Sequence, residues 1–224
     1  MNGASDSTMT YKNILFDLDG TLTDPKLGIT NSIIFSLGKL DIAAPHNDEL
    51  EHFIGPPLSE SYESTYQLTG DRNHLAIDYY REYFSDKGLY ENKVYEGIEE
   101  LLKELKSAGC HLFVATSKPV VFAEQILEHF KLDGYFDAIA GSELDGTRVH
   151  KDEVIKFVVD RYQLDVHDCV MIGDRKHDLV GARKNNMDAI GVMYGYGSLA
   201  ELENEQPVTV VESVEELGDY LKAH

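Results

Sequence analysis

Short apolar runs and amphipathic segments alternate along most of this chain. Six short, mainly apolar runs have the length expected of buried strands, at residues 14–16, 112–115, 138–140, 169–172, 189–192 and 208–211. Apolar residues recur at helical spacing around residues 98–105, 123–130, 154–162, 182 and 214–221. Strands that are apolar on both faces and alternate with helices indicate a parallel sheet covered on both sides. The expected fold class is therefore α/β, with a Rossmann-like parallel sheet core.

The stretch between residues 23 and 93 has a different pattern. Its apolar residues keep helical spacing at residues 29–40, 58–68 and 75–83, and no convincing buried strand is found among them. We therefore expect an all-helical cap domain, inserted after the first strand and standing over the carboxyl end of the sheet. The chain would then divide into an α/β core at residues 11–22 and 94–224, a cap at residues 23–93 and a polar, disordered tail at residues 1–10.

Length and composition are those of a soluble globular protein. The chain has 224 residues, of which 42% are hydrophobic and 27% charged. No apolar stretch approaches the roughly 20 residues needed to cross a bilayer, and no secretory signal precedes the first strand. Cys110 and Cys169 each adjoin a strand-like run, which suits buried free thiols better than a disulfide framework. We therefore expect a cytoplasmic protein without a membrane partner.

The formal net charge of −20 restricts the possible partners. Nucleic acid polymers are bound through Lys and Arg side chains that neutralise phosphates, so this charge argues against a nucleic acid partner. If the ligand is instead a small phosphate ester, the site must concentrate cations locally. The sequence leaves the oligomeric state open between a monomer and a homodimer.

Two aspartates follow the first strand, in the segment Ile-Leu-Phe-Asp-Leu-Asp-Gly-Thr at residues 14–21. Residues two apart along a strand point to the same side, so Asp17 and Asp19 are expected to face one space where the strand ends. Gly20 would let the backbone come close to a ligand there. Carboxylates this close repel each other unless a cation or a shared proton lies between them, which favours chemistry over a solvated Asp-Gly turn.

Other strands also end in chemically useful residues. These residues are Thr116, Ser117 and Lys118 after the strand at 112–115, Asp174 and Asp178 after the strand at 169–172, and Lys151 before a predicted helix. Each has a purely structural explanation, as a helix cap, a solvated side chain or an exposed neighbour. Ligands of open parallel sheets bind outside the carboxyl ends of the strands, so the shared location favours one functional site.

In order and context, these motifs resemble those of the haloacid dehalogenase-like phosphatases over most of the chain. The resemblance implies that Asp17 is the nucleophile, which forms an aspartyl-phosphate, and that Asp19 is the general acid and base. It places the hydroxyl of Thr116, the backbone N–H of Ser117, and the cations Lys118 and Lys151 around the phosphoryl group. It also implies a magnesium ion, with Asp17, Asp174 and the backbone carbonyl of Asp19 as ligands. Asp178 would support this metal group by orienting Lys151 or a metal-bound water.

Three segments look like the phosphoglycolate phosphatase-like branch of that family: residues 20–24, residues 116–119, and Phe-Ile-Gly-Pro-Pro-Leu at 53–58. In that branch the last segment reaches from the cap toward the substrate, which implies substrate contacts from Gly55 and Pro56. On the residues alone, a rigid turn between helices explains it equally well. Members of the family that catalyse the dehalogenase reaction lack the second aspartate, so by resemblance the presence of Asp19 excludes that reaction.

The expected function is magnesium-dependent hydrolysis of a small phosphomonoester, either phosphoglycolate-like or a nucleoside monophosphate. Two alternatives remain at this point. One is a phosphosugar mutase of the β-phosphoglucomutase type, whose extra cap residues we do not identify in this sequence. The other is a non-catalytic regulatory protein that keeps the fold.

Overall fold

A computed structural model describes residues 9–223 of the chain. Its centre is a six-stranded parallel sheet with the strand order β5-β4-β1-β6-β7-β8. The strands are β1 (Asn13–Phe16), β4 (His111–Pro119), β5 (Ala138–Ser142), β6 (Cys169–Gly173), β7 (Asp188–Val192) and β8 (Thr209–Val211). The predicted α/β class with a parallel sheet is therefore confirmed.

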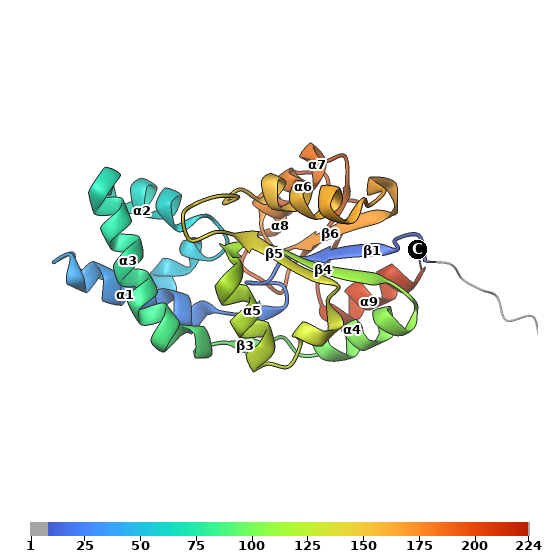
Figure 1. Ribbon diagram of the computed structural model, residues 1–224, viewed down its shortest axis with the longest axis horizontal. Coiled ribbons are helices and arrows are strands. Elements are labelled where there is room, and N and C mark those ends of the chain that lie inside the picture. Colours follow the sequence, from blue (N-terminus) through green and yellow to red (C-terminus); the bar gives the residue numbers. More distant parts are fainter. Residues whose placement is uncertain (1–8, 224) are drawn as a thin grey trace, which may run out of the picture.

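Helices cover both faces of this sheet. Figure 1 shows α6 (Lys151–Tyr162) and α7 (Lys176–Lys184) on one face, and α4 (Ile98–Ser107), α5 (Val120–His129) and α9 (Val214–Ala223) on the other. Ile14 and Phe16 of β1 join the hydrophobic core beneath the second group, whereas Leu15 joins the core beneath the first. All three side chains are fully buried, as expected for a central strand whose residues alternate between two covered faces.

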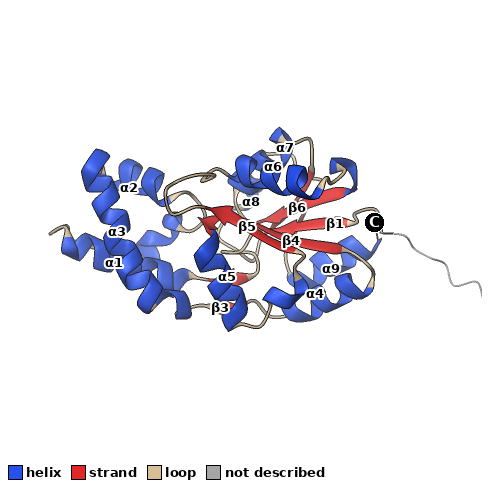
Figure 2. Cartoon of the chain, in the orientation of Figure 1, coloured by secondary structure: helices blue, strands red, loops and turns tan. Residues whose placement is uncertain are grey.

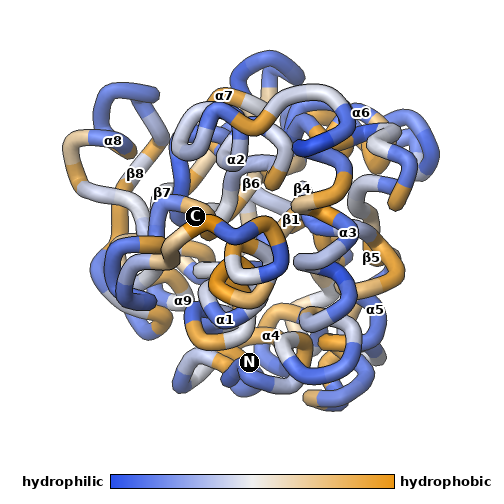
Figure 3. Tube along the Cα trace, turned by 90° about the vertical axis from the view of Figure 1, so that its left-hand side faces the viewer, coloured by the Kyte–Doolittle hydropathy of each residue, from blue (hydrophilic) through white to orange (hydrophobic). Residues whose placement is uncertain are grey.

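Figure 2 shows the same layers by secondary structure, with the strands between two sets of helices. In Figure 3, hydrophobic segments follow β5 and β8 of the sheet, and the outer loops are mostly hydrophilic. One short helix, α8 (Leu199–Glu203), was not predicted from the sequence. Only one of its residues is buried, Leu202, so the helix leaves no apolar period to recognise.

The helices α1 (Lys26–Lys39), α2 (Leu58–Tyr66) and α3 (Gly70–Asp86) lie beyond the carboxyl ends of the strands, together with the 3-10 turn Asn47–Phe53 (Figure 1). We call residues 23–93 the helical insert. The sequence predicted an all-helical cap without a buried strand, and the insert departs from this only at its ends, where the short, partly exposed β2 (Thr23–Asp24) pairs antiparallel with β3 (Lys93–Val94). Two-residue strands are too short to show an alternating pattern. Their pairing brings the chain's entry to the insert and its exit from the insert side by side.

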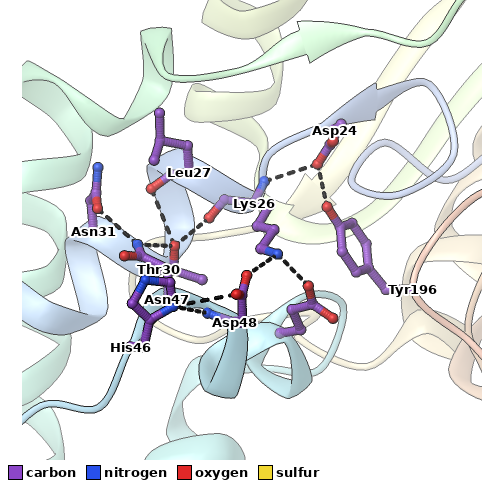
Figure 4. Close-up of polar contacts among 10 residues, drawn as sticks. Asp24, Lys26, Leu27, Thr30, Asn31, His46, Asn47, Asp48 and Tyr196 are labelled. Atoms are coloured by element: carbon purple, nitrogen blue, oxygen red, sulfur yellow. Dashed lines mark hydrogen bonds and ion pairs between the residues drawn. The ribbon is translucent and has the colours of Figure 1, made fainter.

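Polar contacts join the base of the insert to the core (Figure 4). Asp24 accepts a hydrogen bond from the backbone N–H of Lys26 at 3.2 Å and another from the hydroxyl of Tyr196, which lies after β7. The ammonium group of Lys26 lies 2.6 Å from a carboxylate oxygen of Asp48, so α1 is also tied to the 3-10 turn. The segment that leads into the insert is thus held by both parts of the molecule.

Residues 1–8, the larger part of the predicted tail, lie outside the described residues. Met9 packs against the hydrophobic core. Among residues 9–223, no helix is both long enough and apolar enough to cross a membrane.

Candidate active site

Asp17 and Asp19 lie just beyond the end of β1 and are both nearly buried, with 4% and 7% of their surfaces exposed. The backbone N–H of Asp17 donates to Ile172 of β6 at 2.9 Å, which extends the sheet pairing by one residue. The chain then turns at Gly20, whose φ of +83° is a conformation that favours glycine. A Cβ atom on Gly20 would lie 2.2 Å from an oxygen of Asp174, so this turn also requires glycine because Asp174 packs against it.

Lys151, the first residue of α6, places a buried ammonium group between two carboxylates. Its Nζ lies 2.7 Å from Oδ1 of Asp17 and 2.9 Å from Oδ1 of Asp178, and it donates to the backbone oxygen of Ala115 at 2.9 Å. These contacts match the three N–H donors of a lysine. Burial by itself lowers the pKa of Lys151, but the charges of Asp17 and Asp178 outweigh it, and the pKa is raised. Lys151 is therefore charged in the folded protein.

Asp174 completes an acidic group with Asp17 and Asp178, and each of the three can offer an oxygen within 4.8 Å of the other two. Asp174 is fully buried and accepts hydrogen bonds from the backbone N–H of Tyr196 at 2.7 Å and from the hydroxyl of Thr21 at 3.4 Å. Burial, and after it the charge of Asp178, raises the pKa of Asp17 to about 7 and also raises that of Asp174.

One ammonium group does not balance three buried carboxylates, so the group is suited to hold a further cation. Carboxylate oxygens are the ligands that hard cations such as Mg²⁺ prefer. The side chain of Asp19 is not part of this group. Its Oδ2 lies 3.0 Å from Nζ of Lys118, and its buried Oδ1 has no hydrogen-bond partner among residues 9–223.

The end of β4 supplies the neutral and cationic side of the site. Thr116 is 2% exposed, and its hydroxyl oxygen accepts a hydrogen bond from the backbone N–H of Lys118 at 3.1 Å. The ammonium group of Lys118 also lies 4.3 Å from the ring centroid of Phe84, on α3 of the insert. The pairing of β4 with β5 shifts register between Ala115 and Pro119, and in this stretch Thr116, Ser117 and Lys118 line the same space as Asp17.

This space is a cavity of about 480 Å³ between the core and the insert. Asp17, Asp19, Thr116, Ser117, Lys118, Gly55 and Pro56 all line it. The structure thus brings these predicted site residues together. Lys151, Asp174 and Asp178 are not among the residues that line the cavity, but they lie close to Asp17.

Arg175, which was not predicted from the sequence to be a site residue, fixes the loop at Gly55 to the core. Its Nη1 donates to the backbone oxygen of Ile54 at 2.6 Å, and its Nε lies 2.9 Å from a carboxylate oxygen of Glu201. Gly55 has a φ of +112°, and a Cβ atom there would lie 2.9 Å from Cγ of Arg175. In the sequence, the only feature that could have pointed to this role of Arg175 is its position directly after Asp174.

The model of the family described as haloacid dehalogenase-like hydrolase matches residues 14–192. The chain is 51% identical over 219 residues to a protein of Pseudomonas aeruginosa named 5'-nucleotidase, covering 98% of this chain and 99% of that protein. It is also 37% identical over 198 residues to a tyrosine-protein kinase of Mycobacterium tuberculosis, covering 88% of this chain and 67% of that protein.

A solved structure is similar over nearly the same length. The crystal structure of a predicted phosphatase from Clostridium acetobutylicum aligns with a TM-score of 0.92 at 52% identity. The alignment covers 94% of this chain and 97% of that one. The likeness therefore extends over the sheet and the helical insert together.

Proposed function

Because the chain belongs to the haloacid dehalogenase-like hydrolases, we propose that it hydrolyses nucleoside 5'-monophosphates with the help of Mg²⁺ and through an aspartyl-phosphate on Asp17. The family, its phosphoglycolate phosphatase-like branch and the enzyme class of phosphatase agree with the sequence-based predictions. One observation carries the proposal: a buried carboxylate, Asp17, is fixed by Lys151 at 2.7 Å and lines the cavity.

The residues around Asp17 suit the cation that the family implies. Asp17, Asp174 and the backbone carbonyl of Asp19 would hold Mg²⁺, and Asp178 would act through its contact with Lys151. When bound, the cation offsets the negative charge of the carboxylates and of the substrate phosphate. The excess of buried negative charge in this group supports the assignment, because it is repulsive without a further cation.

The chain's own side chains account for the two chemical steps. Lys151 holds Oδ1 of Asp17, which leaves Oδ2 to attack phosphorus, and the bond from phosphorus to the leaving oxygen breaks. Asp19 gives its proton to that leaving oxygen. In the second step Asp19 takes a proton from water, the water oxygen attacks phosphorus, and the carboxylate of Asp17 is released together with inorganic phosphate. The partnerless Oδ1 of Asp19 supports this role in proton transfer.

The remaining polar groups would hold the phosphoryl oxygens in place. The hydroxyl of Thr116 and the backbone N–H of Ser117 line the cavity, and Lys118 adds a cation beside Asp19. Donors that are already fixed before the reaction stabilise the charge that develops in the transition state. These cations resolve the conflict between a net charge of −20 and an anionic substrate, because they are concentrated at the site itself.

The size of the cavity favours a nucleoside over a smaller leaving group. A space of about 480 Å³ falls in the range of roughly 300–1,000 Å³ in which proteins bind drug-sized molecules, and the glycolate part of phosphoglycolate is far smaller. The relative from Pseudomonas aeruginosa, named for action on nucleotides, matches this chain over 98% of its length. Two buried free cysteines, Cys110 and Cys169, fit the proposed cytoplasmic setting.

The test is a substrate panel assayed for release of inorganic phosphate in the presence of Mg²⁺. It contains five nucleoside 5'-monophosphates, phosphoglycolate, β-glucose 1-phosphate and phosphotyrosine. We expect the highest kcat/KM for nucleotides. A higher kcat/KM for phosphoglycolate would contradict the substrate class, and isomerisation of β-glucose 1-phosphate without phosphate release would favour the mutase alternative.

A further inference from the structure

One face of α3 lines the cavity opposite the catalytic carboxylates. His74, Ile77, Asp78 and Arg81 all border it, and their spacing of three and four residues places them on one side of the helix. The reacting phosphate must lie against Asp17, which comes from the core. The part of the substrate that leaves must therefore extend toward this face of the insert.

Arg81 is unusual among the arginines of residues 9–223. Arg148, Arg175 and Arg183 each pair with a glutamate, and Arg72 and Arg161 are exposed to solvent. Arg81 is partly buried at the cavity, and within residues 9–223 its guanidinium forms no hydrogen bond and no ion pair within 4 Å; the charge of Asp78, one helical turn earlier, attracts it from a longer distance. Withdrawing a guanidinium from water without hydrogen-bond acceptors for its N–H groups is unfavourable, so these donors are suited to acceptors on a ligand.

The neighbours of Arg81 restrict what that ligand can be. Asp78, Glu143 and Asp145 also border the cavity, and these carboxylates would repel a leaving group that carries a negative charge. Ile77 lies one helical turn from Arg81 on the same face and offers an apolar surface to a flat ring. A neutral heteroaromatic ring with acceptors on its edge satisfies both conditions.

We propose that Arg81 recognises the base of a nucleoside 5'-monophosphate and makes the enzyme prefer 6-oxopurine substrates; this rests on the proposed function. The parallel N–H groups of a guanidinium match the adjacent O6 and N7 acceptors of guanine and hypoxanthine. Adenine presents an amino donor beside N7, which would face the donors of Arg81. Asp78 can accept a hydrogen bond from the ring N1–H that 6-oxopurines carry and adenine lacks.

The experiment measures kcat/KM for GMP, IMP, AMP and ribose 5-phosphate, with the wild-type enzyme and with Arg81→Gln. For the wild type we expect GMP and IMP to exceed AMP by roughly tenfold or more, the discrimination typical of a bidentate arginine–guanine pair. A glutamine side chain pairs with adenine N6 and N7, so Arg81→Gln should reduce or invert this ratio. Hydrolysis of ribose 5-phosphate, which has no base, should be unchanged.

Arg72→Gln is the matched control, because it makes the same substitution at an exposed position of α3 that does not border the cavity. It should leave all four rates unchanged, and thermal unfolding of both variants checks the fold. An unchanged GMP to AMP ratio in Arg81→Gln, or an equal loss for ribose 5-phosphate, would overturn the role of Arg81. A wild-type enzyme that hydrolyses none of the nucleotides would instead overturn the proposed function.

Discussion

The two carboxylate oxygens of Asp17 have different surroundings. Oδ1 is held by Lys151 at 2.7 Å, so the side chain cannot rotate freely, and Oδ2 is the oxygen that would attack in the proposed reaction. An asparagine at this position could keep the contact with Lys151 through its amide oxygen, but it is a poor nucleophile. Replacing Asp17 by asparagine can therefore separate its structural contact with Lys151 from its proposed role as nucleophile.

We expect Asp17→Asn to lower kcat by three orders of magnitude or more, on the order of losses seen when an enzyme loses its nucleophile. The melting temperature should not fall, because the substitution removes one of the buried like charges. Phosphate release and far-UV circular dichroism measure the two effects. Asp160→Asn, at an exposed position of α6, is the control. Near-normal turnover of folded Asp17→Asn would sink the nucleophile assignment.

Cys169 allows a prediction about pH, since burial raises the pKa of its thiol to about 11. The thiolate is the reactive form and is scarce below that pH, so iodoacetamide should label Cys169 slowly at pH 8 and faster as the pH rises. Unfolding in urea restores an ordinary thiol, and labelling at pH 8 should then be on the order of a hundredfold faster. Cys110→Ser removes the second thiol from the measurement. Similar rates in the folded and unfolded chains would contradict this burial.

The convergence of residues from several strand ends at one edge of the sheet was predictable from the sequence, for a physical reason. Asp17, Thr116 and Asp174 each follow an apolar run, and parallel strands bring their carboxyl ends to one edge whatever the other details of the fold. Arg81 and Arg175 gave no comparable signal. Their positions matter only because the insert lies against the core, and that arrangement has no period along the chain.

Among the helices and strands, too, some could be predicted from the sequence and others could not. Strands and helices with several buried apolar residues were predicted, because each leaves a period of about two or 3.6 residues. The pair β2–β3 and the helix α8 were missed, since two and five residues are too few to show a period. The pair β2–β3 nevertheless joins the two ends of the insert at the core, so an element that the sequence does not reveal can still be important for the fold.

The loop at residues 54–57 is the element whose function the structure makes testable. It borders the cavity, and Arg175 holds it to the core through the backbone oxygen of Ile54 at 2.6 Å. Its two prolines restrict the backbone, which keeps the loop in position for contact with the leaving group. Because the acidic group proposed to hold Mg²⁺ lies in the core, the loop should affect selectivity and leave the proposed metal requirement unchanged.

We expect the double variant Pro56→Ala and Pro57→Ala to change the relative kcat/KM among phosphate esters several-fold. The Mg²⁺ concentration that gives half-maximal activity should stay the same. Pro207→Ala, outside the cavity, serves as the control. An equal loss for every substrate, or a shifted Mg²⁺ requirement, would assign the loop to folding and not to recognition.

Over the protein as a whole, the distribution of charge determines how strongly the stability of the fold depends on a bound cation. The chain carries a formal charge of −20, and three of its carboxylates are buried around one lysine. When all three are ionised, their mutual repulsion opposes folding, and a bound cation would relieve it. Removal of the proposed Mg²⁺ ion should therefore affect the stability of the entire fold as well as the proposed reaction.

We expect saturating Mg²⁺ to raise the melting temperature and chelation to lower it again. At a concentration a hundred times Kd, binding adds about 2.7 kcal/mol to the free energy of unfolding, or roughly 5–10 °C for a domain of this size. Asp174→Asn should abolish this shift, and Asp160→Asn should keep it. Calcium should also stabilise the fold but inhibit turnover, because its looser coordination lets Asp17 bind through both oxygens. Full activity after exhaustive chelation, or a melting temperature indifferent to Mg²⁺, would refute the metal site, and the three buried carboxylates would then need another source of compensation.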